Sequence, residues 1–253
     1  MKTAIVVYAF PRCGSTAIGA LIDEHPAAVC IQNPFDAPGP AAVKRDNFHF
    51  LEETGGPWRS DEEKKDYILR KLYGCTEPGI ELVAMKTVLG VLCSEKEWLA
   101  AKTDMKKICV WREDFLASFV SIVELLDYGR GQHRGLPGTR AEISLGIASD
   151  WCKKVPVEGK IVVLPGQVES YFEGYTWNNA EMKRIFPDAL MVEYQQLLSD
   201  PDKLAADIFA FLGLPDRGIK FPTVKVNTAP LQDRVENYNE MVAAFQACNA
   251  RLN

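Results

Sequence analysis

The sequence lacks any run of about 18 uninterrupted apolar residues, the length that a membrane-spanning helix needs. An apolar run does occur near the N-terminus, but it is too short for the core of a signal peptide and has Pro11 and Arg12 directly behind it. We therefore expect a soluble protein with no stable membrane insertion.

Cys-x-x-Cys pairs are also missing. The seven cysteines among the 253 residues are odd in number and scattered along the chain, which argues against both a disulfide framework and a zinc site. Most of them are expected to be small buried hydrophobic residues in a reducing compartment. The sequence thus predicts a cytoplasmic protein that holds no metal.

The chain has no excess of positive charge. Its formal net charge is -5, so no overall positive field gathers nucleic acid or an anionic membrane surface. We expect no nucleic-acid partner, and any site that binds an anion must be local. The sequence does not indicate an oligomeric state.

What the sequence does contain is an alternation of strand and helix patterns. Apolar runs predict strands at residues 3–9, 28–31, 82–86, 106–111 and 189–193. Apolar residues at helical spacing predict a helix after the first strand and further helices at 61–73, 115–126 and 201–212, whereas the glycine-rich segment 127–140 predicts a mobile loop. This alternation indicates one α/β domain over residues 1–253, with a parallel sheet flanked by helices on both faces.

The end of the first strand carries a pattern that suits an anion. The stretch Pro11-Arg-Cys-Gly-Ser-Thr16 leads from the strand directly into a helix. Gly14 lets the backbone pass close to a ligand, and Ser15 or Thr16 can cap the helix. The backbone N–H groups of residues 13–16, with the helix dipole behind them, make a cradle for phosphate or sulfate, and Arg12 adds a full positive charge.

Other phosphate loops fit this stretch less well. The Walker A pattern G-x-x-x-x-G-K-[ST] needs an earlier glycine and a lysine before Ser15, and both are absent. A cysteine phosphatase needs an arginine six residues after Cys13, where the chain has Gly19. An ordinary strand, turn and helix without a ligand stays open as an alternative.

The same stretch resembles a known motif. Phe10-Pro-Arg-Cys-Gly-Ser-Thr-Ala-Ile18, continued to His25-Pro26, is similar to the 5'-phosphosulfate-binding loop of the sulfotransferase family, whose usual form is close to PRSGST. Cys13 replaces the more usual serine. The resemblance implies a three-layer sandwich like that of P-loop nucleoside triphosphate hydrolases, and 3'-phosphoadenosine 5'-phosphosulfate (PAPS) as the sulfuryl donor.

PAPS carries a second phosphate, and the predicted strand 106–111 ends in a match to the family's 3'-phosphate motif. In Val110-Trp-Arg-Glu-Asp-Phe-Leu-Ala-Ser-Phe-Val-Ser-Ile122, Arg112 can hold a phosphate in bidentate fashion and a serine hydroxyl can donate a further bond. Ser121 fits bacterial members better than Ser118 does. The alternative is that Arg112 forms an ion pair with an acidic neighbour, namely Glu113, Asp114 or Glu193.

Further matches support the fold more than the chemistry. They are Met191-Val-Glu-Tyr194, Ile208-Phe-Ala-Phe-Leu-Gly-Leu-Pro215 and the segment 227–238. Lys86 ends a strand where many family members carry a lysine that faces the donor, so the resemblance makes it a candidate ligand of PAPS. A solvated lysine at a strand edge is the alternative.

The general base is the least determined part of the predicted site. Sulfotransferases use a histidine or a glutamate, and the loop after the second strand often carries a glutamate before Pro-Phe, where this chain has Asn33. Asp36, in the same loop, is the first candidate and His49 the second. An aspartate in a Pro/Gly-rich loop can equally be a turn residue, and a histidine between two phenylalanines can be a packed one.

The resemblance implies in-line sulfuryl transfer from PAPS to a hydroxyl or amine of a small-molecule, carbohydrate or lipid acceptor, without a metal. Two alternatives stay open. One is a P-loop kinase of small molecules, with Ser15 or Thr16 and Glu113 or Asp114 at a magnesium ion. The other is a non-catalytic nucleotide-binding protein of the same fold.

Overall fold

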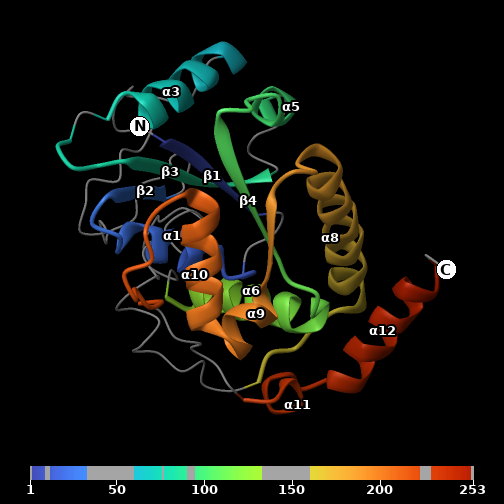
Figure 1. Ribbon diagram of the computed structural model, residues 1–253. Coiled ribbons are helices and arrows are strands. Elements are labelled where there is room, and N and C mark those ends of the chain that lie inside the picture. The colour runs from blue at the N-terminus through green and yellow to red at the C-terminus, as the bar shows by residue number, and fades with distance from the viewer. Residues whose placement is uncertain are drawn as a thin grey trace.

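The protein is described here by a computed structural model that covers residues 2–8, 12–32, 60–75, 77–89, 95–132, 160–222 and 229–251. Five parallel strands form one sheet in the order β2-β3-β1-β4-β5 (Figure 1). They are β1 (Lys2–Tyr8), β2 (Ala28–Gln32), β3 (Leu82–Val88), β4 (Met105–Trp111) and β5 (Leu190–Glu193). The predicted parallel sheet and its five strands are confirmed.

The described helices connect these strands and extend beyond them. They are α1 (Ser15–Asp23), α3 (Asp61–Tyr73), α5 (Glu95–Ala100), α6 (Phe115–Gln132), α8 (Pro165–Ile185), α9 (Tyr194–Ser199), α10 (Pro201–Leu212), α11 (Leu231–Arg234) and α12 (Tyr238–Ala250). The predicted helices at 61–73 and 201–212 have these bounds in the structure.

Helices cover both faces of the sheet, which gives the three layers that the sequence predicts. On one face, Ala4 and Val6 of β1 pack against α1 and α10. On the other face, Ile5 and Val7 of the same strand pack against α3 and the C-terminal end of α8. Because β1 is buried on both faces, its sequence is a continuous apolar run without alternation.

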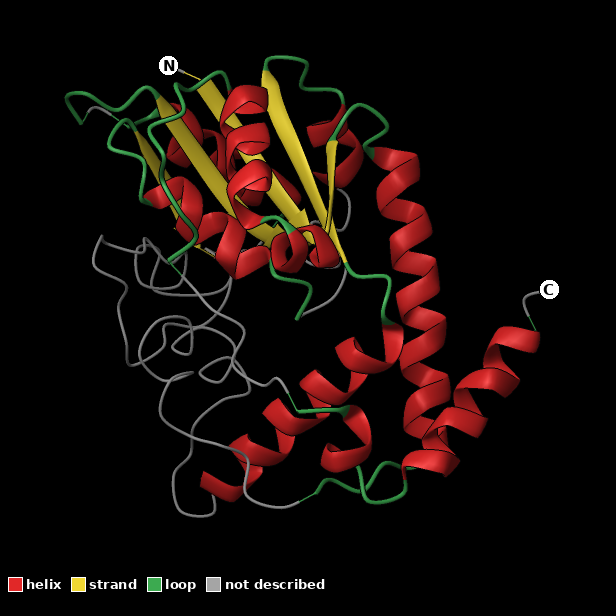
Figure 2. Ribbon diagram, turned by 60° about the horizontal axis from the view of Figure 1, so that its bottom comes forward, coloured by secondary structure: helices red, strands yellow, loops and turns green. Residues whose placement is uncertain are grey.

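A third apolar cluster lies outside the sheet. It joins the first turns of α6 to α8, α11 and α12, and its centre is Phe115, whose ring lies 5.0 to 6.0 Å from the rings of several aromatic neighbours. Figure 2 shows α6, α11 and α12 beyond the arrowheads of the strands, whereas α8 starts there and runs back along the edge of the sheet. The carboxyl ends of the strands therefore face this helical part of the molecule.

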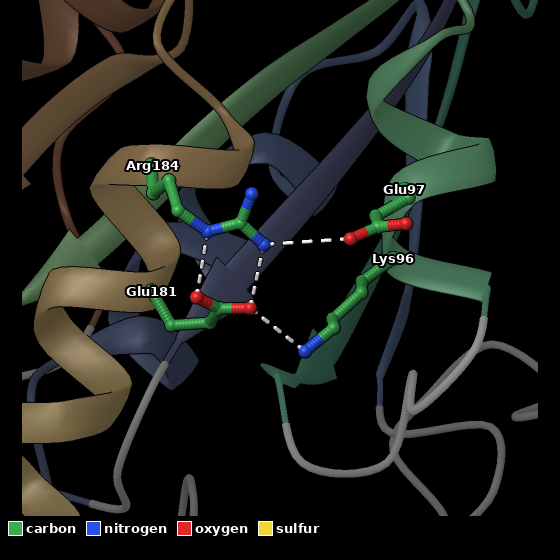
Figure 3. A network of polar contacts seen from close by, with 4 residues as sticks. All are labelled: Lys96, Glu97, Glu181 and Arg184. Atoms are coloured by element: carbon green, nitrogen blue, oxygen red, sulfur yellow. Dashed lines mark hydrogen bonds and ion pairs between the residues drawn. The ribbon is translucent and has the colours of Figure 1, made fainter.

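A network of charged side chains ties α5 to α8 (Figure 3). Arg184 donates from Nε and Nη2 to the two carboxylate oxygens of Glu181, each at 2.8 Å, and Lys96 donates to the same carboxylate at 2.9 Å. Nη2 of Arg184 also reaches Glu97 at 3.4 Å. The hydrogen bonds from Arg184, and then those from Lys96, lower the pKa of Glu181 to about 2.

One prediction about helix length is wrong. Helix α6 continues to Gln132, so residues 127–132 are helical although the sequence predicts a loop from residue 127. Gly129 and Gly131 each destabilise a helix by about 1 kcal/mol relative to alanine. This cost weakens the helix but does not by itself end it. Residues 133–140 of the predicted loop lie outside the described residues.

Two scaffold motifs of the sequence meet in the fold. His25 follows α1 and is completely buried; its Nδ1 accepts a hydrogen bond from the Ala27 N–H at 3.1 Å, so Nε2 donates to the Pro215 carbonyl at 3.2 Å. Gly213, with φ of 71°, ends α10 just before this proline. The His-Pro and Phe-Leu-Gly-Leu-Pro sequences thus support each other.

The described residues test two of the predictions made from the composition. Cys13, Cys30, Cys109 and Cys248 are buried free thiols, as expected, and Cys75 is half-buried. In the described part of the chain, every helix is too short or too polar to cross a bilayer.

Candidate functional site

The carboxyl ends of β1 and β4 form the place where an open parallel sheet binds ligands. These two strands are neighbours, but the chain leaves β1 through α1 toward β2 and leaves β4 through α6 and α8 toward β5. Since the two connections run to opposite sides, a crevice is expected between these strand ends. Arg12 follows β1 and Arg112 follows β4, so both predicted anion sites lie at the strand ends where this crevice is expected.

The turn after β1 has an unusual backbone. Arg12 has a φ of 69° and Gly14 a φ of 89°, which is the left-handed region that residues other than glycine rarely occupy. A Cβ atom at Gly14 would lie 2.8 Å from Cδ2 of Tyr194, so glycine is needed both for the dihedral angle and for the space. Such strain in a non-glycine residue is typical of functional sites.

This turn presents the first N–H groups of α1. The Gly14 carbonyl accepts from the N–H groups of Ala17 at 2.9 Å and Ile18 at 3.2 Å. The N–H groups of Ser15 and Thr16 come before the first of these bonds and have no acceptor within the helix. With the helix dipole behind them they can bind an anion, as the sequence predicts.

Cys13 fills the space beneath the turn. Its side chain is buried, and this burial raises the pKa of the thiol, although hydrogen bonds with Ser15 and the charge of Lys86 lower it in part. The thiol is therefore protonated at neutral pH and is a poor nucleophile. Cys13 acts here as a small packing residue.

Lys86 lies under the same turn and is not solvated. It belongs to β3, an interior strand, and its side chain is only 2% exposed. Its Nζ donates to the Thr16 hydroxyl at 3.0 Å. The alternative of a solvated lysine at a strand edge is therefore wrong, and Lys86 brings a positive charge to the first turn of α1.

Arg112 is buried and has few polar contacts. It is 9% exposed, its Nη1 donates to the Arg12 carbonyl at 3.4 Å, and its Nε has no hydrogen-bond partner among the described residues. Its Cζ lies over the ring of Tyr194, 4.3 Å from the ring centroid. A buried guanidinium with an unsatisfied N–H can accept a charged ligand without losing an internal partner.

The acidic neighbours of Arg112 are engaged elsewhere. Asp114 accepts from the Ala117 N–H at 2.9 Å at the start of α6, and Glu193 accepts from the Glu113 N–H at 3.1 Å. Within the described ranges no ion pair joins Arg112 to any of these carboxylates. The alternative of an ordinary ion pair therefore does not describe this arginine.

The two candidate serines of α6 have different surroundings. Ser121 accepts from Nε of Arg12 at 2.9 Å, which joins the two predicted anion sites directly. Ser118 is 1% exposed, and its hydroxyl lies 3.0 Å from the hydroxyl of Tyr171. Burial raises the pKa of Tyr171 to about 12, so this phenol is neutral. Ser121 is thus the serine at the crevice.

The structure of this chain is similar to solved structures, whereas its sequence matches no family model. No protein-family model matches the sequence, and no curated protein sequence matches it either. Among solved structures, a sulfotransferase from Alicyclobacillus acidocaldarius matches 100% of this chain and 94% of its own, with a TM-score of 0.54 and 12% identity. The chain has a sulfotransferase-like fold.

Two weaker matches are also sulfotransferases. STF1 from Mycobacterium tuberculosis has 14% identity and a TM-score of 0.44, with 98% of this chain and 77% of that chain covered. Mouse SULT7A1, solved in complex with PAP, has 15% identity and a TM-score of 0.40, with 98% and 64% covered. At these values neither match adds to the argument.

Both residues that the sequence predicts as candidates for a general base lie outside the described residues. Asp36 and His49 are in the segment 33–59, so their positions relative to Arg12 stay predictions. Within the described ranges, we find no group of three or more His, Cys, Asp or Glu side chains that could hold a metal ion.

Sequence reasoning missed two tyrosines that contact candidate site residues. Tyr194 stacks on Arg112 and borders Gly14, and Tyr171 pairs with Ser118. Tyr194 had an available signal, because it comes directly after β5, the strand beside β4. Tyr171 lies in α8, for which no helix was predicted.

Proposed function

We propose that the chain is a sulfotransferase that moves a sulfuryl group from PAPS to a hydroxyl or amine of a small-molecule, carbohydrate or lipid acceptor. The observation that carries this proposal is the meeting of two arginines at one crevice, where Arg12 contacts Ser121 and Arg112 contacts the Arg12 carbonyl. A donor with two separate phosphate groups needs two such cationic groups within reach of one molecule.

The proposed roles follow the two strand ends. Arg12 and the N–H groups of residues 13–16 would bind the 5'-phosphosulfate, with Lys86 adding charge below, and Arg112 with Ser121 would bind the 3'-phosphate. Arg12 and Ser121 now satisfy each other at 2.9 Å. An anionic ligand offers Arg12 a partner of opposite charge and offers the Ser121 hydroxyl an ionised acceptor, and both changes strengthen the hydrogen bonds.

In the proposed reaction, the acceptor oxygen or nitrogen attacks sulfur in line with the bond to the bridging oxygen. A new bond to sulfur forms, the bond between sulfur and the phosphate oxygen breaks, and adenosine 3',5'-bisphosphate leaves. Arg12 and the backbone N–H groups stabilise the charge that develops on the leaving oxygens. The acceptor's proton goes to a general base, for which we propose Asp36 first and His49 second.

The kinase alternative is weakened by the position of Lys86. A kinase of this type would use Ser15 or Thr16 to hold magnesium, but the Thr16 hydroxyl accepts a hydrogen bond from the Lys86 ammonium at 3.0 Å. A cation thus already lies against one of the two hydroxyls that this alternative offers to magnesium, and two positive charges so close together repel each other. This contact favours a donor that is bound without magnesium.

Calorimetry with adenosine 3',5'-bisphosphate, without magnesium, tests the proposal. We expect micromolar binding, and a loss of about 1.5 to 3 kcal/mol for Arg12→Ala and for Arg112→Ala, the contribution of a hydrogen bond to a charged group. Arg217→Ala is the matched control, because Arg217 is an exposed arginine far from the two strand ends. It follows α10, whose C-cap residue Gly213 contacts Lys2 at the opposite end of the sheet. Unchanged affinity in both site variants, or binding of ATP that requires magnesium, would refute the proposal.

Transfer of labelled sulfate to a panel of acceptors separates an enzyme from a non-catalytic nucleotide-binding protein. With an active acceptor, Asp36→Asn is expected to lower turnover while nucleotide affinity stays near the wild-type value. Full activity of Asp36→Asn would move the proposed base to His49. Nucleotide binding without transfer to any acceptor would favour the non-catalytic alternative.

A further inference from the structure

Tyr194 lies between the two halves of the candidate site. The guanidinium of Arg112 lies over its ring, with Cζ 4.3 Å from the ring centroid. The edge of the same ring borders the turn after β1, since Cδ2 would be 2.8 Å from a Cβ at Gly14. One side chain thus contacts both predicted anion sites.

Hydrogen bonds alone leave the orientation of Arg112 poorly fixed. Its Nη1 makes a long bond of 3.4 Å to the Arg12 carbonyl, and its Nε has no partner in the described part of the chain. Buried arginines are commonly held by a carboxylate in a fork, which no described acid provides here. The ring of Tyr194 is therefore the contact best placed to orient the guanidinium, whose Nε–H keeps no partner among the described residues.

The ring is itself held in place. Tyr194 is the first residue of α9 and follows Glu193, whose carboxylate accepts from the Glu113 N–H at 3.1 Å and from the Gln195 N–H. These bonds tie the start of α9 to the residue next to Arg112. The side chain of Leu197, one turn later in α9, also packs close to Gly14.

We propose that Tyr194 is a positioning residue that orients Arg112 for the nucleotide, and that it acts through its ring and not through its hydroxyl. This inference rests on the proposed function. A stacked cation contributes about 0.5 to 2 kcal/mol. At 1.4 kcal/mol for each tenfold change, Tyr194→Leu should weaken binding of adenosine 3',5'-bisphosphate by about 2- to 30-fold.

The test is a double-mutant cycle on binding of adenosine 3',5'-bisphosphate. Tyr194→Phe keeps the ring and should keep the affinity near that of the wild type, whereas Tyr194→Leu should lose it. When Arg112 is already alanine, Tyr194→Leu should cause little further loss, because the ring then has nothing to orient. Additive losses, or a loss in Tyr194→Phe equal to that in Tyr194→Leu, would overturn the inference.

A second measurement keeps this inference separate from the proposed function. Ring currents of Tyr194 should shift the Nε–H resonance of Arg112 in a nitrogen–proton spectrum, and Arg112→Lys assigns that signal. The shift should survive Tyr194→Phe and disappear in Tyr194→Leu. If these shifts are observed but the wild type binds no nucleotide, the proposed function is refuted and the role of Tyr194 in orienting Arg112 is supported. If Tyr194→Leu leaves the Arg112 resonance unmoved, that role is refuted.

Discussion

Replacing Gly14 by alanine should destabilise the protein for two separable reasons. The φ of 89° at this residue costs an L-residue about 1 to 2 kcal/mol. The new Cβ would also lie 2.8 Å from Cδ2 of Tyr194 and 3.3 Å from Cδ2 of Leu197, and overpacking of this kind typically costs about 1 to 3 kcal/mol. Together these predict a loss of about 2 to 5 kcal/mol, a large share of the 5 to 15 kcal/mol that stabilises a typical domain.

Gly79 provides a matched control for the first reason alone. Its φ is 86°, and a Cβ there would meet nothing within 4 Å, so Gly79→Ala should cost only the dihedral strain of about 1 to 2 kcal/mol. Denaturant unfolding of the wild type and both variants, compared at equal m-values, measures the difference. If Gly14→Ala is no more destabilising than Gly79→Ala, the close approach of Tyr194 to the turn is refuted.

Two further predictions concern charged pairs. Arg234 donates from Nε to Glu124 at 2.8 Å in a pair whose side chains are each 10% exposed. Arg234→Ala removes the cation from this buried carboxylate and should cost about 3 to 5 kcal/mol in denaturant unfolding. Lys203→Ala breaks the exposed Lys203–Asp207 pair and should cost under about 1 kcal/mol, and equal losses would contradict the role of burial. Glu181, whose pKa is lowered from 4.5 to about 2, stabilises the folded state above its ordinary pKa and loses that contribution as the pH falls from 4.5 toward 2. The stability difference between the wild type and Glu181→Gln should therefore shrink over this range of pH, and a constant difference would show that the ion pairs in Figure 3 do not act.

Prediction from the sequence succeeded where local physics dominates. Strands β1, β3 and β4 each contain a run of buried apolar residues, at 4–7, 82–85 and 108–110, so their positions are visible without knowledge of their partners. Helix α3 begins after Ser60, which accepts from the Glu63 N–H, and α10 begins after Asp200, which accepts from the Lys203 N–H. These caps are local signals, and the bounds of both helices were predicted correctly.

Helix α8 begins with a local signal, since Pro165 stands at its first position and Gln167 accepts from the Leu164 N–H at 2.9 Å, but it has no single apolar stripe. Val168, Phe172 and Tyr175 pack in the helical cluster beyond the sheet, whereas Met182 and Ile185 pack against the face of the sheet that α3 covers. Because the helix serves two cores along its length, its apolar residues do not form one continuous stripe. Its position follows from tertiary packing and not from periodicity.

The sequence by itself determined the strand, the turn and the helix that present Arg12, and the strand that Arg112 follows, because each depends on residues close together in the chain. The tertiary structure alone decided that Arg12 meets Ser121 across 109 positions of sequence and that Tyr194 stacks on Arg112. Those contacts depend on the order of strands in the sheet, which long-range packing sets and local propensity does not.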